Sequence, residues 1–328
     1  MTLDRRNVLI GAASLAGAMG LSGLASAGAP LRVASVKFGS VGWLLETIRR
    51  EKLDAKHGLT LEVVEIANNQ ASPITLYGGS ADVIVSDWPW ALRQRAMGEA
   101  LRFSPFSGAL GAVMVPEASD IRDLAGLKGK RLGVAGSAVD KSWLLLRAYS
   151  KKVLGTDIAE LAVPQFGAAP LLTEQLKDGK LDAVLNFWTF CARLSGSGFR
   201  RLISMSDVMK ALGIDPQPAL VGFIWKEQSE ASHGAAIKAL LAAAAEANAL
   251  LAKEDAAWER LRPLLKAASE QEFSALVAGY RSGIPGPWTT ADMKSAEKIM
   301  DILVAGGDTE LVGNGTRFDA RLFYSSGT

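Results

Sequence analysis

The sequence predicts an α/β protein built from two lobes, each a mostly parallel sheet flanked by helices. From Leu31 onward, short apolar stretches alternate with segments of helical periodicity, a pattern typical of parallel strands joined by helices. Two stretches, at 79–88 and 179–188, share one order of small turn, apolar strand, then polar and aromatic residues. With 328 residues, of which 49% are hydrophobic and 21% charged, the chain is long and apolar enough to bury two cores.

Residues 1–27 have the composition of an export signal that is removed from the mature chain. Arg5 and Arg6 precede an uncharged stretch from Val8 to Leu24, which ends in the small-x-small cleavage pattern at 25–27. The paired arginines favour a twin-arginine signal, and an ordinary secretory signal is the alternative. A membrane anchor is a further alternative, because the stretch is about as long as a short spanning helix. No later segment is expected to span a bilayer.

The first unit of the mature chain has the pattern of a strand, a Gly/Ser loop and a helix. Apolar residues at 31–36 predict the strand, residues 39–42 the loop, and apolar residues at 44–48 the buried side of the helix. A second strand is predicted at Leu61 to Ile66. Parallel sheets bind ligands beyond the carboxyl ends of their strands, so Ser40 and Gly42 are candidate binding residues.

Three further junctions of strand and helix follow the same plan. The strand within 79–88 ends in Asp87 and Trp88. At 127–147, Gly136 permits a sharp turn, and Ser137 or Asp140 can cap the next helix. A helix at 171–177 leads to the strand within 179–188, which ends in a polar residue and two aromatic ones.

Two apolar strands are expected to join the lobes as hinges. One lies at Ala109 to Val115 and the other within Pro216 to Lys226. If the chain crosses at the first and returns at the second, a ligand cleft lies between the lobes. The expected lobes are then 28–110 with 222–328, and 111–221. The return is mainly helical, with helices predicted at 235–253, 258–267, 270–280 and 290–304.

Polar and aromatic side chains gather at the predicted strand ends and helix starts, which describes a small-molecule pocket better than a reaction centre. The predicted ligand-binding residues are Ser40, Gly42, Asp87, Trp88, Ser137, Asp140, Ser142, Asn186 and Trp188. Two interpretations of Asp87 and Asp140 remain open. If they face the cleft, they disfavour an anionic ligand and favour a cation held over tryptophan. If they cap helices, they turn away from it.

The composition gives little support to catalysis, metals or nucleic acid. The chain has only two histidines, His57 and His233, in separate contexts, and it has no metalloprotease, P-loop or nucleophile-elbow pattern. Its formal net charge of +2 does not indicate nucleic acid. The single cysteine, Cys191, excludes an intrachain disulfide and lies in an apolar run, which favours a buried side chain over a nucleophile. We expect no catalytic residue, metal or cofactor.

Several motifs together resemble a known family. They are the export signal, the Gly-Ser-Ala-Asp-Val turn and strand at 79–83, the run DLAGLKGKRLGV at 123–134, and Gly136-Ser137 before a helix. They are similar to those of the SsuA/THI5-like group of periplasmic solute-binding proteins, whose members take aliphatic sulfonates, taurine, nitrate or thiamine precursors. The run at 123–134 is the most specific of these features.

The resemblance implies a type 2 periplasmic binding protein fold with two hinge strands. It also implies a monomer in the periplasm that captures a small organic solute and presents it to the permease of an ABC importer in the inner membrane. A different class of function is a periplasmic sensor or accessory protein for a receptor or oxidoreductase. A third is a pyrimidine-synthase-like enzyme, but such enzymes carry a cysteine-rich motif and an active-site histidine that this chain lacks.

Overall fold

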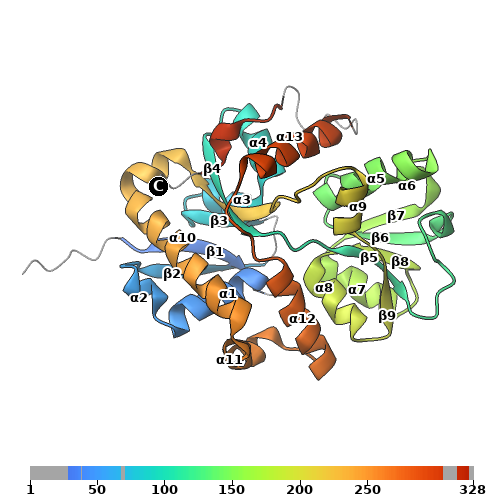
Figure 1. Ribbon diagram of the computed structural model, residues 1–328, viewed down its shortest axis with the longest axis horizontal. Coiled ribbons are helices and arrows are strands. Elements are labelled where there is room, and N and C mark those ends of the chain that lie inside the picture. The colour runs from blue at the N-terminus through green and yellow to red at the C-terminus, as the bar shows by residue number, and fades with distance from the viewer. Residues whose placement is uncertain (1–28, 38, 68–70, 306–315, 325–328) are drawn as a thin grey trace, which may run out of the picture.

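The structure is a computed structural model that describes residues 29–37, 39–67, 71–305 and 316–324 (Figure 1). It contains two five-stranded sheets with helices on both faces of each. The predicted export signal at 1–27 lies outside the described residues.

The first sheet has the strand order β2-β1-β3-β10-β4. Strand β1 runs parallel to β2 and β3, whereas β10 is antiparallel to both β3 and β4. The strands are β1 (Leu31–Val36), β2 (Leu61–Ile66), β3 (Val83–Asp87), β4 (Leu101–Ser107) and β10 (Val221–Lys226).

The second sheet repeats this plan in the order β7-β6-β8-β5-β9. Strand β6 is parallel to β7 and β8, and β5 is antiparallel to β8 and β9. The strands are β5 (Ala112–Pro116), β6 (Arg131–Ala135), β7 (Val163–Gly167), β8 (Ala183–Asn186) and β9 (Phe199–Ser204). The predicted α/β class with two sheets is confirmed. Each sheet is mixed. Strand β10 in the first sheet and strand β5 in the second each follow a crossing between the units, and each runs antiparallel to its two neighbours.

An arginine and an aspartate fix the same corner of both sheets. Arg32 in β1 donates to both carboxylate oxygens of Asp82, at 2.7 and 3.0 Å, and Asp82 also accepts from the Arg32 backbone N–H. Arg131 in β6 makes the same set of hydrogen bonds to Asp182. The two units thus share a local bonding pattern as well as a topology, in line with the repeat seen in the sequence.

Helices α1 (Ser40–Arg50), α2 (Leu53–Lys56), α10 (Glu230–Lys253), α11 (Asp255–Leu265) and α12 (Glu270–Ser282) share one core with the first sheet. That core includes the buried rings of Trp43, Trp258 and Phe223. Helices α3 (Ala71–Tyr77) and α4 (Trp88–Ala96) contribute to a second core on the other face. The short turns η2 (Glu227–Ser229) and η3 (Ala320–Leu322) complete this unit.

Within the described ranges, one segment, Glu227–Lys253, is long and apolar enough to cross a membrane by length and composition. The expectation that no segment after the signal passes this test was therefore wrong, because an alanine-rich run raises its mean hydropathy to 1.5. In the structure the segment forms η2 and α10, which packs on α1 and α2. Ile237, Leu240 and Leu251 of α10 are buried, which is the packing of a core helix.

Figure 1 shows α5 (Lys141–Leu154), α6 (Ile158–Leu161) and α9 (Met205–Ala211) above the second sheet. Below it lie α7 (Ala169–Lys177) and α8 (Trp188–Ser195), while η1 (Ala125–Leu127) precedes β6. Helix α13 (Thr290–Ala305) packs on α5, and Lys298 donates to the carbonyl of Gly213 beyond α9 at 2.7 Å. The predicted lobe boundaries assign α13 to the first lobe, at 222–328. In the structure, α13 also contacts helix α5 of the second unit.

The chain passes between the two units at 108–111, 212–220 and 283–289. The first and third crossings lie side by side, since the Gly108 N–H donates to the Gly283 carbonyl at 2.7 Å. A Cβ on Gly283 would lie 2.4 Å from the Ala109 Cβ, so only glycine permits this approach. The hinge region therefore contains a third connection that the sequence did not predict.

Candidate functional site

Two acidic residues cap the helices that follow parallel strands in the two units. Asp87 ends β3, and its Oδ1 accepts from the Trp90 backbone N–H of α4 at 2.9 Å. Asp140 follows Gly136, whose φ of 99° makes the sharp turn after β6, and its Oδ1 accepts from the Ser142 N–H of α5 at 2.8 Å. The structure therefore shows helix capping for both acids. Capping does not turn them away from the interface, however, because the second oxygen of each approaches Lys141.

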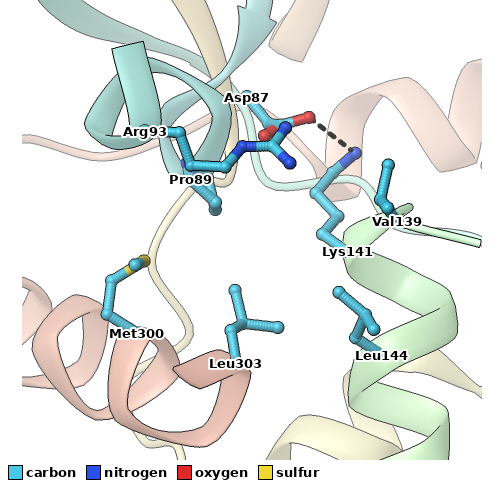
Figure 2. A pocket seen from close by; sticks show the side chains of 8 residues that line it. All are labelled: Asp87, Pro89, Arg93, Val139, Lys141, Leu144, Met300 and Leu303. Atoms are coloured by element: carbon cyan, nitrogen blue, oxygen red, sulfur yellow. Dashed lines mark hydrogen bonds and ion pairs between the residues drawn. The ribbon is translucent and has the colours of Figure 1, made fainter. Parts of the chain in front are cut away.

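The first residue of α5 joins these caps across the two units. Figure 2 shows the ammonium of Lys141 directed at Asp87, and the Lys141 Nζ to Asp87 Oδ2 distance is 3.4 Å. Lys141 Nζ also lies 3.9 Å from Asp140 Oδ2. The guanidinium of Arg93, from α4, is drawn next to the Asp87 carboxylate in the same view. Two acids and two bases thus meet where the helix starts of the two units face each other.

Burial and neighbouring charges shift the pKa values of these groups. Desolvation raises the pKa of Asp140, the Asp87 charge raises it further, and Lys141 opposes the change. Desolvation alone would lower the pKa of Lys141, but Asp87 and Asp140 outweigh it and the pKa rises. Desolvation lowers the pKa of Arg93 against the opposing effect of Asp87. Lys141 therefore stays charged at neutral pH, held by the two carboxylates.

Beside these charges lies a cavity of about 30 Å³, covered by Met300 and Leu303 of α13 and by Leu144 of α5. That volume suits one or two water molecules and is too small for an organic solute. The two units are therefore in contact here, and a solute would have to separate the side chains that line this region.

A second contact between the units is aromatic. Trp188 begins α8, and its ring centroid lies 5.9 Å from that of Trp43 in α1, edge to face. The ring also packs on α12, because a Cβ on Gly279 would lie 2.8 Å from it. One helical turn and a half further on, Arg193 of α8 pairs with Glu272 of α12. Helix α8 of the second unit is thus fixed to two helices of the first.

The remaining predicted residues differ in what they contact. Ser40 is the buried first residue of α1, and Gly42 lies two residues further along. Ser137 is exposed in the turn before α5, and Ser142 is buried in its first turn. All four lie at or just before the starts of α1 and α5.

Trp88 and Asn186 are engaged within their own units. Trp88 is fully buried with its ring 5.8 Å from that of Phe323, and its Nε1 has no hydrogen-bond partner among the described residues. The Asn186 amide donates to Thr173 Oγ1 and the Ala169 carbonyl, and its Oδ1 accepts from the Phe187 N–H. The Asn186 side chain thus connects the start of α8 to α7.

The sulfur of Cys191 is buried next to the carbonyls of Ala112 and Asn186. Burial raises the pKa of its thiol to about 12, so the thiolate is scarcely populated at neutral pH. The sequence-based expectation of a buried, unreactive cysteine is confirmed. In the part of the chain that the structure describes, no group of three His, Cys, Asp or Glu side chains could hold a metal ion.

Sequence reasoning missed Lys141, Arg93 and Trp43. One local signal existed for Lys141, since a cation in the first turn of a helix opposes the helix dipole and calls for a compensating anion. Nothing local identifies Arg93 or Trp43 as contacts of the site, because their partners belong to other elements of the fold.

A family model described as NMT1/THI5 like matches residues 55–256. No curated protein matches the chain. Among solved structures, the alkanesulfonate-binding protein SsuA from Xanthomonas axonopodis pv. citri, bound to MOPS, is 19% identical with a TM-score of 0.69, covering 90% of this chain and 98% of that one. The periplasmic aliphatic sulphonate binding protein SsuA from Escherichia coli is 20% identical with a TM-score of 0.65, covering 87% and 94%.

A ligand-binding component of an ABC-type import system from Staphylococcus aureus, with zinc bound, has 12% identity and a TM-score of 0.65, covering 84% and 91%. At such identities the likeness shows the fold, and it confirms the predicted type 2 periplasmic binding protein architecture.

Proposed function

Because the chain belongs to the NMT1/THI5-like family, we propose that it is the substrate-binding component of an ABC importer. It captures a small organic solute between its two units and presents the closed form to a permease in the inner membrane. The export signal predicted at 1–27 would place it in the periplasm.

The observation that carries the proposal is the contact of Lys141 with Asp87 across the two units. Both residues stand at helix starts that follow parallel strands, the position where α/β sheets bind ligands. The chain crosses between the sheets through connections whose hinge glycines pack closely. Two units joined in this way can open to admit a solute and close through the charged residues at their interface.

The charges at the interface favour a solute with an anionic group. One oxygen of Asp87 and one of Asp140 accept from helix N–H groups, and their other oxygens face Lys141. Neither acid therefore offers a free carboxylate to a cationic ligand. Lys141 has three N–H donors, and an anion at the start of α5 gains from the helix dipole as well.

We therefore propose that Lys141 receives the anionic group, with the starts of α1 and α5 as further donors at Ser40 and Ser137. Gly42 lies beside them, but its N–H already donates to the Gly39 carbonyl. Trp188 supplies an apolar wall, because its indole lies at the start of α8 beside Trp43. The names of the two SsuA structures are consistent with this chemistry, since both proteins bind sulfonates.

A thermal-shift comparison tests the proposal. The purified chain is heated with ethanesulfonate, butanesulfonate and MOPS, and with butylamine and choline as cationic counterparts. A ligand at about 100 times its Kd adds about 2.7 kcal/mol to the free energy of unfolding, so a bound sulfonate raises the melting temperature clearly. Stabilisation by the amines alone would contradict the proposed anion site, and stabilisation by none of the compounds would contradict solute capture of this class.

A further inference from the structure

A second and much larger cavity lies at the hinge. Its volume is about 790 Å³, and its walls include the crossings at 108–111 and 283–289, one face of α8 and the end of α12. Asp87 and Lys141 do not line it, and none of the predicted residues at the starts of α1, α4 and α5 does. It is therefore distinct from the small cavity beside Lys141.

The walls have the composition of a ligand pocket. They are mostly small or apolar, with the indoles of Trp188 and Trp288 as the largest surfaces. A volume of this size lies within the range of about 300 to 1,000 Å³ that is typical of pockets for drug-sized molecules. Such pockets occur preferentially between domains.

The charged groups of the cavity favour an anion. Asp292 is engaged, because its Oδ2 accepts from the Thr289 N–H at 2.8 Å and from the Thr289 hydroxyl at 2.6 Å. Arg201, on the edge strand β9, has no carboxylate partner among the described residues. Ser206 and Gln217, which also line the cavity, form hydrogen bonds with each other. Arg201 is thus the cationic group of the lining that is available to an occupant.

The cavity and the interface between the units share a side chain. Trp188 lines it, and the same indole contacts Trp43 and lies against Gly279. Its walls come from helices of both units and from two of the crossings, so its shape depends on how the units are oriented. An occupant would therefore favour one orientation over others.

We propose that this hinge cavity is a second ligand site beside the solute cleft, with which it shares Trp188, and that it takes a small organic anion with an aromatic body. Arg201 binds the anionic group, and the indoles of Trp188 and Trp288 contact the ring. The site would couple its occupant to opening and closing of the units.

Calorimetric titration with 2-naphthoate, and with neutral 2-naphthamide as the matched ligand, tests this site. The expected result is saturable binding of one naphthoate, with naphthamide about tenfold weaker because it lacks the charge-assisted hydrogen bond. The Arg201→Gln variant should bind both compounds equally weakly. Lys210→Gln, which removes an exposed cation of α9 outside the cavity, should match the wild type.

A second variant tests whether naphthoate binds in this cavity or elsewhere on the protein. Ala278 is exposed on α12 and lines the cavity, so Ala278→Phe fills space there without disturbing a core. It should abolish naphthoate binding while the melting temperature stays near that of the wild type. Naphthoate binding that is absent in the wild type, or unchanged by Arg201→Gln or Ala278→Phe, would overturn the proposal.

Discussion

Lys141 Nζ, in the first turn of α5, lies 3.4 Å from Oδ2 of Asp87, the residue that caps α4, and this contact joins the two sheet-bearing units. Only 13% of the Lys141 side chain and 25% of the Asp87 side chain are exposed, so water screens the pair less than it screens a surface ion pair. The contact places a charged pair where a solute would enter.

Asp87→Asn and Lys141→Gln should each lower the free energy of unfolding, and the double variant should lose less than the sum. We expect a coupling energy of about 1 kcal/mol, measured by urea denaturation of the four chains in a double-mutant cycle. Lys37 and Glu65 form a matched exposed pair at 3.3 Å, for which the coupling should be close to zero. Additive effects at Asp87 and Lys141 would show that the contact does not hold the units together.

Asp140→Asn should change the pH dependence of stability. Burial raises the folded-state pKa of Asp140 above its ordinary value, so the folded chain binds this proton more tightly than the unfolded chain does. The carboxylate therefore destabilises the fold progressively as pH rises above the ordinary aspartate range. Asparagine caps a helix about as well as aspartate, so the variant should gain stability relative to the wild type as pH rises above about 4, the ordinary pKa of aspartate. Urea midpoints across this rise in pH check the expectation, and parallel pH profiles would contradict it.

Gly279→Ala should disturb the contact between α8 and α12. The added methyl would lie 2.8 Å from the Trp188 ring, and overpacking of this kind costs about 1–3 kcal/mol, more than alanine gains in a helix. We expect a lower melting temperature and a red shift of tryptophan emission.

Gly234→Ala is the matched control for this change, because Gly234 lies in α10 and its added methyl would approach only the Glu230 side chain, at 4.0 Å. It should raise stability by about 0.5–1 kcal/mol. If both glycine variants were stabilised alike, Trp188 would not be held against α12.

Cys191 should resist thiol reagents in the folded chain. Its sulfur is buried and burial raises its pKa to about 12, so a titration with Ellman's reagent near neutral pH should be slow until the chain is unfolded. In denaturant it should release one equivalent, since the chain has one cysteine. Fast stoichiometric reaction in the native state would mean that α8 does not cover the thiol as described.

Sequence periodicity missed three of the four edge strands. The edge strand Leu61–Ile66 was predicted with its observed bounds, and the central strand Val221–Lys226 was predicted within the longer range 216–226. Strands β4, β7 and β9 were missed, and all three lie at sheet edges. Edge strands bury less, so β4 carries Arg102 and Pro105 while β9 carries two arginines, and the apolar alternation is lost.

The site was predictable where chemistry is local. An aspartate just before a helix predicts a cap, and both Asp87 and Asp140 are caps. The direction of the Asn186 amide toward α7 and the position of Trp43 against Trp188 depend on packing between elements distant in sequence. Such relationships follow from tertiary structure, which residue patterns in one chain do not encode locally.

The central claim, that a solute with an anionic group is held at the interface by Lys141, is tested most directly by calorimetric titration of a stabilising sulfonate. We predict that Lys141→Gln weakens its affinity about tenfold or more, because a charge-assisted hydrogen bond is lost, while Lys210→Gln leaves it unchanged. Equal affinity of the wild type and Lys141→Gln would contradict the account and place the anionic group elsewhere.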